Sequence, residues 1–528
     1  MDQTGAGVHP DNSLLSDGPI GRSAGAVADW LTSSDHKKIG RLFTGFGLLG
    51  MALVAVIGAL LQLEDIIDSD SFSGPTLRAF GQLHHFGLVL MVLAPLTVGL
   101  SLAVVPMQVG ARSIAFARSA QFGFVSWFLG AVLTAVAVIN GGGIGGSDSD
   151  MVDLSLASMA LMSIGLCAVA VSIATTVLTS RAPGMTMRRV PFFSWSALIQ
   201  SLAILITLPV LLGLVVYLFI DHRHTARVFG GSEAFGVWIP RFFSAPIVYI
   251  FAIPALGVFA EAVPVAFGRR HPLRQVVFAG LALVGIGGFS AVTMQNDFPV
   301  DFSGVGADII SELVVMAFFV GLPLLGVIVT LFASLLVAKP TGGPSPKPRL
   351  VSPLLFGLVS LLLIALGAIV GVLLQIVDLE LSNSNAATGS VVLVALAGAL
   401  GAIGGLAFWS PKLSGRSGDE KKVAPLALLG GLGTLLAGAP MVLTGISGTQ
   451  SSLMSTLSLV GYALIVLTVL AYVAAMRSAP RDGGLNPWCA HTIEWSLASP
   501  APADNYSAVP VLRSAEPELD QTSEGSPS

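Results

Sequence analysis

Charged side chains are scarce in this sequence of 528 residues. Asp, Glu, Lys and Arg make up 11% of the chain and hydrophobic residues 54%, whereas a soluble globular protein carries roughly 25% charged residues. This shortage excludes a disordered chain, a nucleic-acid-binding protein and most soluble enzymes. The apolar runs are continuous rather than alternating, which also excludes an outer-membrane barrel. The chain is therefore expected to be a helical protein of the lipid bilayer.

Cysteine and histidine are rare as well. The two cysteines cannot form a disulfide framework, since Cys167 falls in an apolar run and Cys489 lies after the last one. The eight histidines limit the metal chemistry that the chain can support, because imidazole is the usual ligand of haem iron and copper in proteins. Their positions therefore carry much of the functional interpretation.

Apolar runs long enough to cross a bilayer, roughly 20 residues each, recur about twelve times. They predict an all-α fold, a polytopic membrane bundle of about twelve transmembrane helices. The expected parts are an N-terminal tail at 1–38, a membrane domain at 39–477 and a C-terminal tail at 478–528. The predicted spans are 39–63, 83–107, 119–143, 153–178, 194–220, 239–267, 275–296, 306–337, 350–377, 388–410, 423–447 and 454–476.

The few charges are distributed unevenly between the two sides of the predicted bundle. Of 26 Lys and Arg residues, only Arg78, Arg223, Arg227 and Arg241 fall on the side opposite the termini. The positive-inside rule then predicts a multi-pass protein of the cell membrane with both termini in the cytoplasm. Residues 1–28 lack the apolar core of a signal peptide and are expected to form a flexible tail. The segment after 478 is rich in Pro and Ser and is expected to lie extended on the surface.

Several motifs occur in a fixed order along the chain and carry a family resemblance. They are similar to subunit I of the haem–copper oxidases, of the cytochrome c oxidase type, over nearly the whole chain. The motifs are residues 29–40 (DWLTSSDHKKIG), 106–111 (PMQVGA) with 115–118 (AFAR), 242–249 (FFSAPIVY), 408–415 (FWSPKLSG), 486–488 (NPW), 492–495 (TIEW) and 499–502 (SPAP).

The resemblance implies six histidines inside the membrane, three for two haems and three for copper. Only His84 and His85 fall within a predicted span of this chain. Two histidines cannot do the work of six. The others are expected outside the spans: His9 and His491 in the tails, His36 before the first span, and His222, His224 and His271 in loops.

Alignment with the family by position identifies what replaces the missing ligands. His84 stands at the low-spin haem position of the second span, and it is the only candidate for a residual haem ligand. Other cofactors are not expected. The positions of the copper histidines fall on Ala245 and Gln295-Asn296, and those of the two remaining haem histidines on Gly389 and Val391. The positions of the arginines that hold haem propionates fall on Ser451-Ser452 and Gln62. The positions of two acids of the family's proton paths fall on Ile247 and Ser113.

Three further side chains form a candidate polar site within the membrane. Tyr249 keeps a family tyrosine, but alanine at 245 removes the histidine to which it would be bonded, so a packed and hydrogen-bonded tyrosine is favoured. Glu261 and Glu312 are expected at or within span interiors, where a carboxyl group must be protonated or paired. They could line a proton path, but a structural pair or a subunit contact fits equally well.

These residues predict a degenerate subunit I with no catalytic residues and no metal site. Its expected role is an accessory, assembly or structural one in the aerobic respiratory chain, with the lipid bilayer and other oxidase subunits as partners and no nucleic acid. Two alternatives stay open. One is an active terminal oxidase that oxidises cytochrome c, reduces oxygen and pumps protons. The other is a proton or ion transporter that reuses the emptied cofactor cavity through Glu261 or Glu312.

Overall fold

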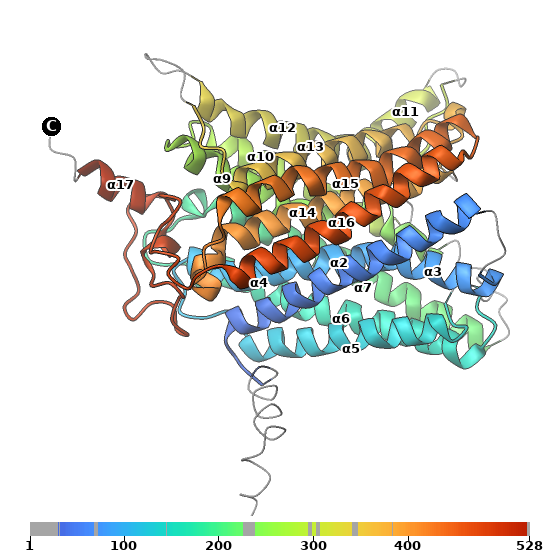
Figure 1. The fold of residues 1–528 in the computed structure, drawn as a ribbon, viewed down its shortest axis with the longest axis horizontal. Helices are drawn as coiled ribbons and strands as arrows, with labels where there is room; N and C mark the ends of the chain where they lie inside the picture. Colours follow the sequence, from blue (N-terminus) through green and yellow to red (C-terminus); the bar gives the residue numbers. More distant parts are fainter. Residues whose placement is uncertain are drawn as a thin grey trace, which may run out of the picture.

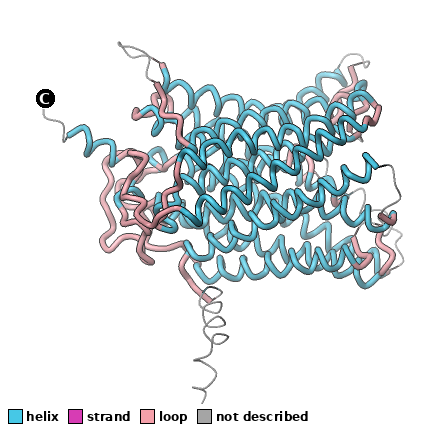
Figure 2. Tube along the Cα trace, viewed as in Figure 1, coloured by secondary structure: helices cyan, strands magenta, loops and turns pink. Residues whose placement is uncertain are grey.

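The chain folds into a bundle of long helices that run side by side, with the loops gathered at its two ends (Figures 1 and 2). The computed structural model describes residues 30–524 apart from 31, 68–71, 144, 225–237, 294–297, 303–306, 340–346 and 383. The predicted N-terminal tail at 1–28 lies outside the described residues. The predicted all-α membrane bundle is confirmed.

Twelve helices in the described part of the chain are long and apolar enough to cross a bilayer, and each overlaps one predicted span. They are α2 (His36–Ile67), the continuous helix of α3 (Gly74–Gly87), η2 (Leu88–Leu93) and α4 (Ala94–Gln108), α5 (Ala117–Ile139), α6 (Ser149–Thr179), α7 (Phe192–Arg223), α9 (Val248–Phe267), α10 (Arg274–Gly285) with η5 (Ile286–Ala291), α11 (Ala307–Met316) with η6 (Ala317–Gly321) and α12 (Leu322–Leu335), α13 (Ser352–Leu373), α14 (Asn385–Ser414), α15 (Glu420–Ser447) and α16 (Ser452–Ser478).

Three of these helices form the centre of the bundle. The helix α3–α4, α9 and α14 are almost entirely buried, whereas the other membrane helices of the described chain leave one side exposed. The outer helices form a ring around the centre, in which each helix packs against the next. The order of the ring is α2, α5, α6, α7, α10, α12, α13, α15 and α16, and α16 packs against α2. The exposed outer surface is apolar, as a bilayer requires.

Two helices begin at other residues than the sequence predicted, and capping and proline residues explain both differences. The second helix begins nine residues before the predicted start at 83, at Gly74. Its first turn is stabilised by the Ser73 hydroxyl, which accepts a hydrogen bond from the Thr76 amide, and by Pro75 at the start of the helix. The sixth helix begins later than predicted, at Val248, because Pro240 opens a separate short turn, η4 (Pro240–Phe243).

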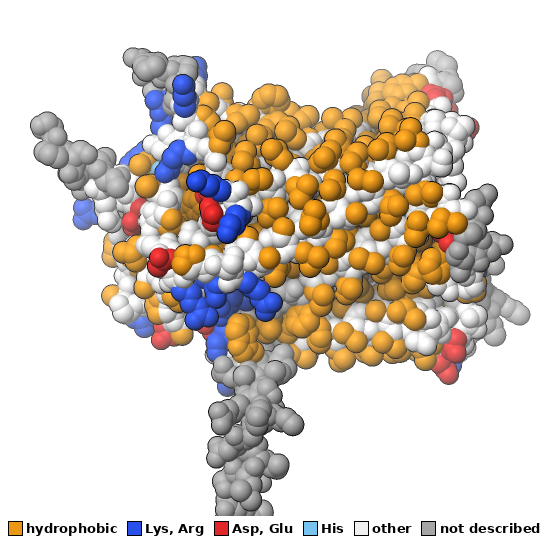
Figure 3. Space-filling model, in the orientation of Figure 1, with side chains coloured by type: hydrophobic (Ala, Val, Ile, Leu, Met, Phe, Trp, Pro, Cys, Tyr) orange, Lys and Arg blue, Asp and Glu red, His pale blue; other side chains and the backbone are white. Residues whose placement is uncertain are grey.

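The two ends of the bundle differ in charge. Lys and Arg side chains gather where the apolar surface ends beside the C-terminal residues, and Asp and Glu are seen at the other end (Figure 3). The first is called the basic end below and includes Arg188, Arg269 and Arg416. The second is called the acidic end and includes Asp148 and Asp378.

The residues after α16 do not lie extended, so that prediction is wrong. Residues 479–524, called the C-terminal segment below, cover the helix ends at the basic end and finish in α17 (Pro517–Glu524) (Figure 1). Trp488 and Trp495 are buried, and the Tyr506 hydroxyl donates to the Met107 carbonyl oxygen over 2.7 Å. Buried aromatic side chains give this segment its affinity for the bundle.

Candidate functional site

His84 lies on α3 inside the bundle and is 4% exposed. Its ring meets the Tyr462 ring of α16 edge-on, with 5.3 Å between the ring centroids. A Cβ built on Gly58 of α2 would lie 2.9 Å from His84 Nε2 and 2.7 Å from the Tyr462 ring. Two helices therefore pack directly against the nitrogen that a haem iron would need.

The His84 Nε2 atom is buried without a hydrogen-bond partner among the described residues. The sequence favoured a relict histidine that forms hydrogen bonds inside the bundle, but the Nε2 atom forms none with the described residues, and the ring instead contacts Tyr462. The same holds for Nε2 of His85, whose ring packs edge-on against Phe86. Within the described chain, neither imidazole belongs to a group of three or more His, Cys, Asp or Glu side chains that could hold a metal ion.

The central helices touch one another where the resemblance would place haem. A Cβ built on Gly398 of α14 would lie 2.6 Å from Leu93 Cδ1 of η2 and 3.2 Å from Ala252 Cβ of α9. A Cβ on Gly389 would lie 2.7 Å from Val442 of α15. Close helix contacts and apolar side chains fill these positions, so the residues present do not fit a haem held between two imidazoles.

The position of the copper centre is filled by a neighbouring helix. Tyr249 of α9 is buried, and a Cβ on Gly371 of α13 would lie 2.0 Å from its hydroxyl oxygen and 3.1 Å from Ala245 Cβ. Contrary to the prediction, the Tyr249 hydroxyl has no hydrogen bond of normal geometry within the described residues, although the Ser390 side chain lies beside it. The aligned positions Gln295 and Asn296 lie outside the described residues.

Two other described histidines lie at the ends of helices. His36 is the first residue of α2 and is buried, so its predicted place before the first span is off by one turn. Its Nδ1 lies 3.2 Å from the Leu102 carbonyl oxygen. His222 is in the last turn of α7 rather than in a loop, and its Nδ1 lies 2.9 Å from Asp153 of α6. Within the described chain, no three His, Cys, Asp or Glu side chains are grouped to hold a metal ion.

Glu261 stabilises the start of another helix. It lies in α9 toward the basic end and is 4% exposed. Its Oε2 accepts a hydrogen bond from the Phe193 backbone N over 3.2 Å. Phe193 is the second residue of α7, where backbone N–H groups have no partner within the helix and a carboxyl group is favourable. Arg274 of α10 is the positive charge beside it.

Glu312 lies near the start of the candidate membrane helix Asp308–Ala338. It lies in α11 at the acidic end and is half-buried. Its Oε2 accepts from the Asp301 backbone N over 3.0 Å, which holds the loop before α11 against the helix. Glu261 and Glu312 therefore lie at opposite ends of the bundle, and the structure does not bring them together with Tyr249 into one polar site.

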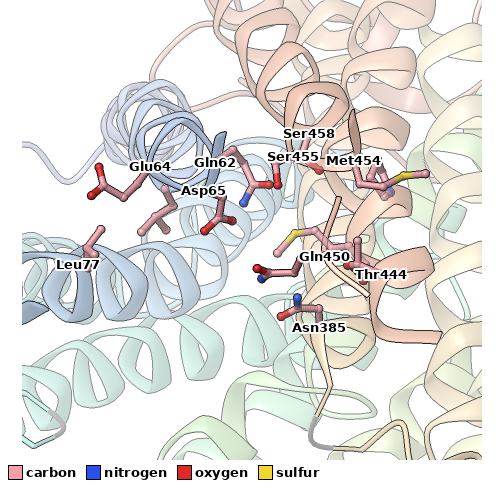
Figure 4. A pocket seen from close by; sticks show the side chains of 13 residues that line it. Gln62, Glu64, Asp65, Leu77, Asn385, Thr444, Gln450, Met454, Ser455 and Ser458 are labelled. Carbon is pink, nitrogen blue, oxygen red and sulfur yellow. Dashed lines mark hydrogen bonds between the residues drawn. The ribbon is translucent and has the colours of Figure 1, made fainter. Parts of the chain in front are cut away.

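A polar pocket at the acidic end lies one helical turn from the His84 contact. It has a volume of about 310 Å³ and is lined by residues of α2, α3, α14, α15 and α16. Figure 4 shows Gln62 and Asp65 across the pocket from Gln450 and Asn385. Glu64 and Asp65 are the charged side chains of its described lining. Haem propionates would meet carboxylates here rather than arginines, which disfavours their binding.

The C-terminal segment supplies a buried carboxyl group that the sequence did not predict. Glu494 is fully buried, and its Oε1 accepts hydrogen bonds from Trp409 Nε1 (3.0 Å), Gln108 Nε2 (3.1 Å) and the Thr492 hydroxyl (2.8 Å). Burial raises the pKa of Glu494, and the three hydrogen bonds oppose the rise. The available signal was the motif at 492–495, which was used only for the resemblance.

A neighbouring cation completes this cluster. Lys412 in the last turn of α14 is fully buried, and its Nζ donates to the carbonyl oxygens of Trp495 (3.2 Å) and Leu497. The backbone N of Ala501 donates to the Lys412 carbonyl oxygen over 2.8 Å. The cluster fixes the C-terminal segment to the helix ends, and Glu494 Oε2 is left buried without a hydrogen-bond partner among the described residues.

Comparison with known proteins decides the family. The family model "Cytochrome C and Quinol oxidase polypeptide I" matches residues 38–476, which is the whole membrane bundle. The chain belongs to this family.

Its relatives within the oxidase polypeptide I family match along most of their length. A protein of the cytochrome c oxidase subunit 1-beta type from Streptomyces avermitilis is 28% identical, over 94% of this chain and 92% of its own. The cytochrome c oxidase subunit 1 of Alkalihalophilus pseudofirmus is 26% identical, over 93% and 82%. The cytochrome bo(3) ubiquinol oxidase subunit 1 of Buchnera aphidicola is 26% identical, over 92% and 78%. The predicted resemblance is confirmed.

Proposed function

We propose that this chain is a degenerate oxidase polypeptide I that performs no oxygen chemistry and acts as an accessory, assembly or structural component of the aerobic respiratory chain. The proposal rests on the side chains that occupy the family's haem-ligand positions in this chain. His84 is the one imidazole at a family ligand position, and its Nε2 packs against Gly58 and Tyr462. A low-spin haem needs a second axial ligand, and the aligned Gly389 and Val391 have no side-chain donor.

Optical spectroscopy of the purified full chain tests this proposal directly. A reduced-minus-oxidised difference spectrum is expected to lack a haem α-band, and metal analysis is expected to find neither iron nor copper in stoichiometric amount. The same measurement on the His84→Ala variant serves as the matched control, since the two spectra should be identical. Stoichiometric haem together with copper would overturn the proposal and favour the active oxidase.

The proposed partners are other subunits of a respiratory oxidase. Subunit-I-like folds with apolar outer helices are suited to packing against further membrane helices, and the relatives carry the names of oxidase subunits. Affinity purification of the tagged full chain from native membranes is expected to recover oxidase subunits. Purification without any respiratory protein would contradict this role, while leaving the absence of cofactors untouched.

An ion path through Glu261 and Glu312 has less support. The two carboxyl groups lie at opposite ends of the bundle, and each accepts a hydrogen bond from a backbone N–H group. Proton flux into liposomes that contain the chain is therefore expected to equal that of protein-free liposomes, and to be the same for the Glu261→Gln variant. A flux that the variant abolishes would favour the transporter.

A further inference from the structure

A groove with three arginines lies between α2, α14 and α16 at the basic end. It has a volume of about 310 Å³ and is separate from the pocket at the acidic end. Its positive groups are Arg41 in α2, Arg416 after α14 and Arg477 in the last turn of α16. None of its lining residues is acidic. A groove of this charge attracts an anion.

The rest of the groove is apolar. Below the arginines it is lined by Leu48 of α2, Leu406 and Leu413 of α14, and Val473 and Met476 of α16. Both α2 and α16 belong to the outer helices, and Figure 3 shows basic side chains where the apolar surface of this face ends. A ligand of the groove is therefore expected to have an anionic head at the membrane surface and an apolar body within the bilayer.

Arg477 is available to a ligand. Its side chain is exposed and makes no hydrogen bond or ion pair with any residue that the structure describes. Arg41 is partly engaged, because one terminal nitrogen donates to the Leu413 carbonyl oxygen over 3.3 Å. Its Nε–H is buried and has no acceptor in the described chain. An unpartnered donor of this kind is stabilised when a ligand oxygen reaches it.

The groove also lies at the C-terminal ends of two helices, whose carbonyl groups repel anions. The arginines offset this repulsion. Arg416 donates to the carbonyl oxygens of Met476 (3.5 Å), Arg477 and Ala479 (2.8 Å). Arg41 donates to the carbonyl oxygen of Leu413. The acid nearest in sequence, Asp35, pairs with Lys37 over 3.1 Å and also lies near enough to Arg41 to interact with its charge, so one acid faces three arginines. The groove therefore keeps a positive surface toward the membrane.

We propose that this groove binds the phosphate group of an anionic phospholipid, with the acyl chains along α2 and α16. Arg guanidinium groups match phosphate oxygens in geometry and charge, and basic pockets between membrane helices are known to bind anionic head groups. The site is independent of the proposed function, since it lies on the outer surface of the bundle and involves no cofactor position.

Native mass spectrometry of the full chain in detergent tests the site, with phosphatidylglycerol as the probe. We expect phosphatidylglycerol to bind more tightly than phosphatidylcholine, and Arg477→Gln and Arg41→Gln each to weaken binding about fivefold. Arg188→Gln is the matched control, because Arg188 is an exposed arginine of the same end that does not line the groove. The control should bind as the unchanged protein does.

Three results would overturn the proposal. One is equal affinity for the two lipids. Another is an equal effect of Arg188→Gln and Arg477→Gln, which would indicate general attraction to a basic surface. The third is displacement of the lipid by inorganic phosphate, which would assign the arginines to a free anion. Because Arg477 is exposed and its side chain holds no described residue, its variant is expected to fold, so unchanged binding by that variant counts against the site.

Discussion

His84 illustrates how one residue can keep its family position after its chemistry has been removed. The imidazole is buried, its Nε2 atom lacks an acceptor or donor among the described residues, and its ring rests on Tyr462. A buried polar atom without a partner costs about 1–3 kcal/mol. In a haem protein an iron bond would offset that cost. Here the edge-on ring contact, about 0.5–1.5 kcal/mol, offsets only part of it.

This balance predicts the effect of removing the imidazole. His84→Leu replaces the ring by an apolar side chain of similar volume and is expected to leave the free energy of unfolding within about 1 kcal/mol of its original value. Thermal unfolding of the purified chain in detergent checks this. Tyr462→Ala is the contrast, because it opens a cavity beside His84 and should lower stability by about 3 kcal/mol. A large loss for His84→Leu, accompanied by loss of bound haem, would contradict the interpretation.

At the scale of helices, the central three approach one another closely, which fits the proposal that this bundle encloses no cofactor. Gly398 of α14 allows Leu93 of η2 and Ala252 of α9 to meet the α14 backbone. Gly398→Leu is expected to force these helices apart and to lower stability by about 1–3 kcal/mol. Gly213→Leu is the control, because a Cβ on Gly213 of α7 meets no atom within 4 Å.

The same unfolding measurement compares the two glycine variants. Equal stability of Gly398→Leu and Gly213→Leu would mean that α14 can move away from η2 and α9 at no cost. The region between the central helices would then have room for a bound group, and the proposed loss of the cofactor cavity would be wrong.

The C-terminal segment is the second element whose behaviour can be predicted. Burial and the positive charges of Arg349 and Arg270 lower the pKa of His491 from 6.5 to about 4. When the segment detaches, His491 takes up a proton below pH 6.5. Its contribution to docking is therefore complete above pH 6.5 and is lost as the pH falls toward 4. Burial raises the pKa values of Glu494, Glu516 and half-buried Glu518, so these carboxyl groups have the opposite trend.

The variant His491→Leu isolates this effect from that of the carboxyl groups. The hydrogen-exchange protection of residues 479–524, taken relative to the exchange rate of an unfolded chain at each pH from 7 down to about 4, is expected to fall more steeply in the unchanged chain than in His491→Leu. Parallel curves for the two proteins would show that His491 does not contribute to the pH dependence of docking.

The limits of sequence analysis are clearest at these elements. Hydropathy predicted all twelve spans because each is a long apolar run with few charges. It missed the first turns of α3, since the polar sequence at 74–82 depends on the Ser73 cap and Pro75. Glu494 and Lys412 could not be paired in advance, because they are far apart in the chain and meet only when the C-terminal segment covers α14.

For the whole molecule, the distribution of charge predicts its orientation in the membrane. The basic end holds most of the Lys and Arg residues, together with the C-terminal segment and the start of α2 (Figures 1 and 3). Positively charged loops are retained in the cytoplasm during insertion. The acidic end, with Asp148, Asp150 and Asp378, has few positive charges. We therefore expect the basic end to face the cytoplasm.

Cysteine labelling in intact cells tests this orientation. A cysteine at exposed Lys421, at the start of α15 on the basic end, should react with a membrane-impermeant maleimide only after the cells are opened. A cysteine at exposed Glu380, in the loop after α13 on the acidic end, should react in intact cells. Both variants need Cys489→Ser, because Cys489 is an exposed thiol of the basic end. The reverse pattern would mean that the twelve helices cross the membrane in the opposite direction, and the arginine groove would then face the outer leaflet.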